Sequence, residues 1–184
     1  MDTVSYYFYD HLADQLNPSG LSNLANIFEY QPWNQFIHRH HDRRILIAVI
    51  IVPGKVLFQS YDSKILTSKD LSRYHRLSSI QVSPKAPQAT EPHEFEDFEK
   101  TLNALISLIY PGTVFKFLGQ HNHQLQGPLS EVPFTLLILR NEDDLSLDFI
   151  NKQVLLNRLK DVELVGHCHH EALNSLLEDL LVQN

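Results

Sequence analysis

Three short histidine runs contain the residues of this chain whose type and spacing are best suited to chemistry. They hold most of its 11 histidines. Histidine titrates near neutral pH and is the commonest metal ligand in proteins, so each run is a candidate metal site or pH-dependent site. None of them completes a known metal-binding or catalytic motif. The runs are His38-Arg39-His40-His41, His121-Asn122-His123 and His167-Cys168-His169-His170.

The third run has the position that best favours a ligand site. It follows the second of two predicted strands, 134–139 and 162–165, which a predicted helix at 145–159 connects. Such β-α-β units nearly always have parallel strands, so both carboxyl ends share the sheet edge where open α/β sheets bind ligands. Imidazole and carboxylate groups there would suit a divalent metal such as zinc. The candidate ligands are His167, His169, Asp143 and Asp144.

A structural interpretation competes for the same residues. His169 and His170 lie four and three residues before Leu173, so in a final helix they would share its apolar face. The acidic residues at 142–144 would cap the helix that follows them. Cys168 would open the final helix, where the dipole lowers a thiol's pKa, but the residue six positions later is Asn174, not the arginine of a cysteine phosphatase loop.

The other two runs have weaker claims. His121 and His123 fall in the segment 119–133, which contains Gly127-Pro128 and is predicted to be a loop. Such a loop joins antiparallel strands more easily than parallel ones, which would place the pair at the opposite edge from His167. His38 and His41 would share a helix face if the second N-terminal helix continues past Pro32, and we expect a solvated helix end there.

Apolar periodicity predicts the elements that must position these residues. Unbroken aliphatic runs are typical of strands that are covered on both faces, and Pro53-Gly54 predicts a tight turn between antiparallel strands. Helical spacing of apolar residues predicts two N-terminal helices, the second interrupted near Pro32, two helices within the sheet region and a final one. The predicted strands are 45–52, 55–58, 79–82, 113–118, 134–139 and 162–165, and the predicted helices are 5–16, 21–36, 93–110, 145–159 and about 167–181.

These elements predict a single α/β domain over 1–184, because the chain is long enough for one sizeable core and contains no clear linker. We expect a three-layer α/β/α arrangement with a mixed sheet of five or six strands. Residues 1–40 would form an N-terminal helical extension, and 44–184 would form the sheet core.

Composition limits the functional classes. The formal net charge of -7 disfavours general nucleic-acid binding, which needs an excess of Lys and Arg. With one Cys, the chain can form neither an intrachain disulfide nor a cysteine-based zinc cluster. No signal peptide or membrane-spanning run is visible, so a cytoplasmic location without membrane association is expected. The 6 glycines form no phosphate-binding loop.

A run of N-terminal aromatic residues favours a binding function. Four consecutive rings at 6–9 cannot all face the core side of one helix, and tyrosine and tryptophan are enriched at interfaces. The main hypothesis is a small acidic accessory protein that recognises another protein, without a cofactor. The alternatives are a metal-dependent hydrolase that uses the predicted histidine and aspartate site, and a pH sensor. The candidate interface residues are Tyr6, Tyr7, Tyr9 and Trp33.

Overall fold

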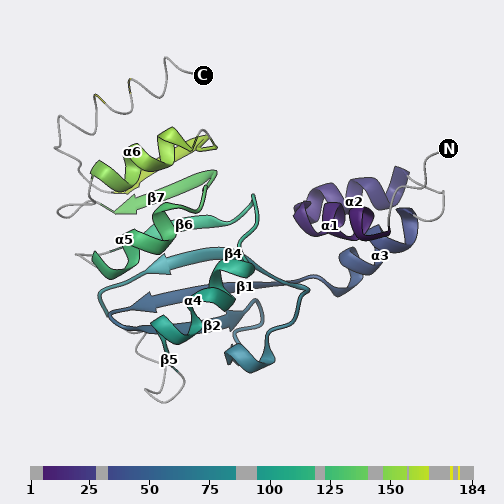
Figure 1. Cartoon of the computed structure of the whole chain (residues 1–184), viewed down its shortest axis with the longest axis horizontal. Helices are drawn as coiled ribbons and strands as arrows, with labels where there is room; N and C mark the ends of the chain where they lie inside the picture. The colour runs from purple at the N-terminus through teal and green to yellow at the C-terminus, as the bar shows by residue number, and fades with distance from the viewer. Residues whose placement is uncertain are drawn as a thin grey trace.

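The computed structural model describes residues 6–27, 33–85, 95–118, 123–140, 147–156, 158–165, 175 and 178. They form a mixed sheet with helices packed on it, and three N-terminal helices lie beside the sheet (Figure 1). The α/β class is confirmed, and the sheet has eight strands instead of five or six. No helix within the described ranges is long and apolar enough to cross a membrane.

All predicted strands are present. Two further strands of only two residues each were not predicted, because a pair of residues carries no periodic pattern. One of the predicted strands begins four residues earlier than expected, at His75. The strands are β1 (Ile45–Val52), β2 (Lys55–Ser60), β3 (Ile65–Leu66), β4 (His75–Val82), β5 (Glu96–Asp97), β6 (Val114–Phe117), β7 (Leu136–Arg140) and β8 (Asp161–Val165).

The helices largely follow the predicted apolar spacing. The predicted second N-terminal helix corresponds to two helices, 18–27 and 33–43, and its predicted interruption near Pro32 lies outside the described residues. The predicted final helix also lies outside them apart from Ser175 and Glu178. A 3₁₀ turn, η1 (Ser68–Asp70), precedes β4. The helices are α1 (Tyr6–Gln15), α2 (Pro18–Ile27), α3 (Trp33–Arg43), α4 (Phe98–Ser107), α5 (His123–Ser130) and α6 (Leu147–Leu155).

The parallel part of the sheet follows the order of the chain. The sheet order is β3-β2-β1-β4-β6-β7-β8, and each neighbouring pair from β1 to β8 in this order is parallel. Right-handed crossovers that always step in the same direction place their helices on the same face. Figure 1 shows α4, α5 and α6 on this one face. The predicted β-α-β unit of β7, α6 and β8 is confirmed.

The predicted loop at 119–133 is wrong. Residues 123–130 form α5, and β6 and β7 are parallel, with Val114 opposite Leu136. A helix that crosses the sheet face is the usual way to join parallel strands. Gly127 and Pro128 weaken the helical pattern in the sequence, whereas Leu129 is fully buried against the sheet and fixes the helix there.

The described residues form two separate hydrophobic cores. The larger one lies between the sheet and the helices α4 to α6, and it includes Phe58, Phe98 and Phe134. The smaller one holds the three N-terminal helices together through Ala13, Leu21 and Ile37. We call α1, α2 and α3 the helical module, because its core is not part of the sheet core.

The turn between β1 and β2 gives a first testable prediction. Gly54 has a φ of 70°, and an added Cβ would meet no atom within 4 Å, so replacement by Ala costs only the left-handed backbone conformation. We expect Gly54→Ala to lower the free energy of unfolding by about 1 kcal/mol in urea denaturation. Gly127→Ala is the matched control, since it also has open space but lies in a helix, where Ala stabilises. Equal effects of both substitutions would contradict this account.

Candidate functional site

Five aromatic rings form a continuous cluster across α1 and α3. The ring centroids of Tyr9 and Trp33 are 4.4 Å apart in an edge-to-face arrangement. Phe36 lies 5.7 Å from Tyr6 and 6.4 Å from Tyr9, and Phe8 lies 5.9 Å from Tyr9. Such separations are typical of favourable aromatic pairs. We call Tyr6, Phe8, Tyr9, Trp33 and Phe36 the aromatic cluster.

Much of the aromatic surface on α1 faces solvent. The exposed fractions are 65% for Tyr6, 86% for Tyr7 and 54% for Phe8, and Leu12 is also exposed. The reason is helical geometry: Ala13 points into the small core, so a run of four rings must extend around the helix beyond the buried face. Exposed apolar surfaces of this kind are often interaction sites.

The structure places all four predicted interface residues on the helical module. Tyr6 and Tyr7 are exposed, while Tyr9 and Trp33 are partly buried between α1 and α3. Phe8 was not among the predicted residues, although it belongs to the same aromatic run. Phe8 is exposed because the buried face of α1 is the one that carries Ala13. A single alanine is a weak signal of a buried helix face in the sequence.

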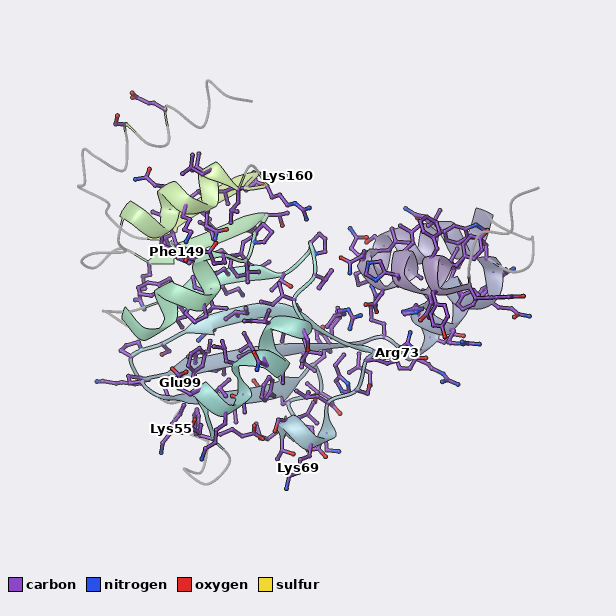
Figure 2. All side chains as sticks on the ribbon, in the orientation of Figure 1. Lys55, Lys69, Arg73, Glu99, Phe149 and Lys160 are labelled. Carbon is purple, nitrogen blue, oxygen red and sulfur yellow. The ribbon has the colours of Figure 1, made fainter. Side chains whose placement is uncertain are left out.

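Beneath the aromatic cluster, a group of charged side chains connects the helical module to the sheet. The Asp10 carboxylate binds the Arg73 guanidinium, and Asp14 binds Arg76. His40 is buried between them, with its Nε2 2.9 Å from Asp10 Oδ1 and its Nδ1 3.7 Å from Asp14 Oδ1. Figure 2 labels Arg73 on the side of the sheet that faces the three helices. We call these five residues the ionic junction.

Arg44 strengthens the same connection through the backbone. Its guanidinium donates hydrogen bonds to the carbonyl oxygens of Leu16, Ala13 (3.0 Å) and Asp14 (3.1 Å). These carbonyls lie at the carboxyl end of α1, where a helix leaves such groups without partners and carries a partial negative charge. Arg44 therefore caps α1 and fixes its orientation relative to the start of β1.

Burial and hydrogen bonding act against each other on the pKa values of His40 and Asp10, and both pKa values are lowered. Burial lowers the pKa of His40 below its ordinary value, although the neighbouring Asp10 acts to raise it. Burial acts to raise the pKa of Asp10, but hydrogen bonds from Arg73 and His40 outweigh this effect and lower it. The junction therefore contains a neutral imidazole near pH 7 beside the ionised carboxylate of Asp10.

The predicted metal site is not tested. His167, His169, Asp143 and Asp144 all lie outside the described residues, as does Cys168. Within the described ranges, no group of three or more His, Cys, Asp or Glu side chains is arranged to hold a metal ion.

One of the other two histidine runs differs from its predicted arrangement, whereas His38 and His41 lie at the solvated end of a helix, as predicted. α5 begins at His123 and follows β6, which is parallel to β7, so this residue lies towards the same sheet edge as the carboxyl end of β7. The predicted opposite edge is therefore wrong. On α3, His38 and His41 are exposed, and His40 between them is the residue that is buried.

Asp97 has a structural role at the start of α4. The Asp97 side chain accepts a hydrogen bond of 3.1 Å from the backbone N–H of Lys100 and caps the helix.

Comparisons of the chain with protein-family models, with curated proteins and with solved structures found no match. Among the described residues, the aromatic cluster with its charged surroundings is the strongest candidate functional site.

Proposed function

We propose that this chain is a non-catalytic binding protein that recognises another protein through the exposed side of the aromatic cluster. The observation that carries the proposal is the exposure of Tyr6, Tyr7 and Phe8 on a single helix turn. Large aromatic side chains supply much of the binding energy in protein interfaces. The net charge of -7 favours a protein partner over a nucleic acid.

The competing explanation is that these rings only stabilise the module. It accounts for Tyr9, Trp33 and Phe36, which pack between α1 and α3. It does not account for the exposed ring of Phe8, since the core of the module consists of Ala13, Leu21 and Ile37 and excludes this residue. The exposed face of Phe8 can therefore contact a partner.

Site-specific photocrosslinking tests this proposal. A photoreactive phenylalanine analogue at position 8 is expected to crosslink the full chain to one discrete protein in an extract of its source. The matched control carries the analogue at Tyr61, which is 98% exposed on the turn after β2, and should give no such product. Equal products from both positions, or none from position 8, would contradict the proposal.

The metal-dependent hydrolase remains the alternative proposal. The cytoplasmic location, and the division of the chain between a helical extension and a sheet core at residues 40–44, also remain proposals. Its candidate ligands His167 and His169 follow β8, and Asp143 and Asp144 follow β7. The parallel pairing of β7 and β8 supports a shared edge for these two segments. Elemental analysis of untagged protein is the direct test, and stoichiometric zinc would favour this alternative.

A further inference from the structure

Two arginines of α3 lie over aromatic rings, Arg39 over a ring of the aromatic cluster and Arg43 over Tyr74. The Arg39 guanidinium carbon lies 5.4 Å from the centroid of the Phe36 ring, and that of Arg43 lies 5.6 Å from the centroid of Tyr74. Both arginine side chains are exposed. Neither forms an ion pair with any carboxylate in the part of the chain that the structure describes. Each guanidinium is therefore held beside a ring with its donors available to a ligand.

Two of the three described carboxylates of the helical module point away from these arginines, and the third, Asp42, is exposed on α3 beside Arg43. Asp10 and Asp14 are directed towards the sheet, where Arg73 and Arg76 bind them. Helix α2 has no charged residue, and Asp42 lies 3.1 Å from His41 Nδ1. The exposed residues of α1 include no acidic side chain: they are Tyr6, Tyr7, Phe8, His11, Leu12 and Gln15. The edge of the aromatic cluster is thus basic, although the whole chain carries a net charge of -7.

The spacing of the two arginines defines a geometry for the ligand. Residues four apart share a helix face and are separated by about 6 Å along the axis. Guanidinium groups bind carboxylates through paired hydrogen bonds. Two carboxylates four residues apart on a helix, or two residues apart on a strand, have a matching separation of about 6 to 7 Å.

We infer that the partner contacts this surface with an acidic segment, whose apolar side chains pack on Tyr6 and Phe8 and whose paired carboxylates bind Arg39 and Arg43. This inference rests on the proposed function and names the chemistry of its partner. The net negative charge of the rest of the chain repels such a segment, so electrostatics would steer it towards α3. Specificity then comes from the sign of the partner's charge as well as from its apolar residues.

Peptide titration tests the inference with Trp33, the only tryptophan, as the reporter. Two synthetic peptides without tryptophan share the same Leu and Phe positions at helical spacing, and carry either Glu or Lys at the remaining positions. We expect the acidic peptide to change the Trp33 fluorescence with a Kd at least about tenfold lower than that of the basic peptide. The preference should weaken as salt is added, because exposed charges are screened.

Charge reversal assigns the effect to the two arginines. The double variant R39E/R43E should lose about tenfold in affinity for the acidic peptide, which is the loss expected for two exposed charge pairs. The control K55E/K69E makes the same change in charge at exposed lysines far from the three helices in Figure 2, and should bind as the original chain does. No response to either peptide, equal Kd values, or equal losses in both variants would overturn the inference.

The proposed function can survive that failure. If a partner crosslinked through position 8 binds R39E/R43E as tightly as the original chain, the partner is real and the charge inference is wrong. If position 8 captures nothing and the acidic peptide still binds through Arg39 and Arg43, the acidic specificity stands without the proposed contact at Phe8.

Discussion

Replacement of Arg76 by Ala should lower the free energy of unfolding by about 3 kcal/mol. The guanidinium is buried, binds Asp14 and donates to the carbonyl oxygens of Arg73 (2.7 Å) and His75 (2.6 Å). Loss of one member of a buried pair leaves the other charge without compensation, at a cost of about 3 to 5 kcal/mol. We expect the lower end of that range, because Asp14 is 27% exposed and is partly hydrated.

Urea unfolding followed by Trp33 fluorescence measures this effect in the helical module. With a denaturant dependence of about 2 kcal/mol per molar urea, the midpoint should fall by about 1.5 M. Arg158→Ala removes an exposed arginine from the same chain and should change the free energy by less than about 0.5 kcal/mol. An unchanged Trp33 midpoint for Arg76→Ala would show that the ionic junction does not hold the module in place.

Acidification should destabilise the protein through His40 before it affects the carboxylate of Asp10. The pKa of His40 is lowered by burial, so the folded state keeps a neutral imidazole at pH values where the unfolded chain is protonated. The stability that this neutral form provides is complete above the unfolded pKa of about 6.5 and is lost as pH falls towards the folded pKa. One titrating group changes the free energy of unfolding by at most about 1.4 kcal/mol per pH unit.

The contribution of His40 is measured by how the free energy of unfolding changes with pH, and not by its absolute value at one pH. The variant His40→Gln can still bond to Asp10 but does not titrate, so its free energy of unfolding should decline less between pH 7 and 5. His38→Gln on the same helix is the control, because His38 is exposed and should leave the slope unchanged. The lowered pKa of Asp10 acts only below its ordinary value of 3.8, outside this interval. Equal slopes for His40→Gln and the original chain would refute the assignment.

The sequence predicts most of the sheet because the relevant forces act locally. β1 is an unbroken aliphatic run, and Pro53-Gly54 accounts for the hairpin with β2. The parallel β7-α6-β8 unit follows from the alternation of strand and helix patterns. α5 is the exception, since Gly127 and Pro128 disfavour a helix that packing of Leu129 against the sheet nevertheless stabilises.

The ionic junction, in contrast, depends on contacts between distant residues. Asp10 and His40 are 30 positions apart, and Asp10 and Arg73 are 63 positions apart. Within its run, His40 cannot be distinguished from His38 and His41 until the docking of α3 on α1 is known. Spacing within the run directed attention to the two exposed histidines, whereas burial makes His40 the one that matters.

The order of strands in the sheet also has a consequence for synthesis of the chain. The hairpin of β1 and β2 is complete first, and β4, β6, β7 and β8 then join in the order in which they are translated. Each new strand adds to a free edge, and none has to separate two strands that are already paired. Because domains can begin to fold during translation, this sheet can grow outward as the ribosome releases it, with β8 as the last strand to be added.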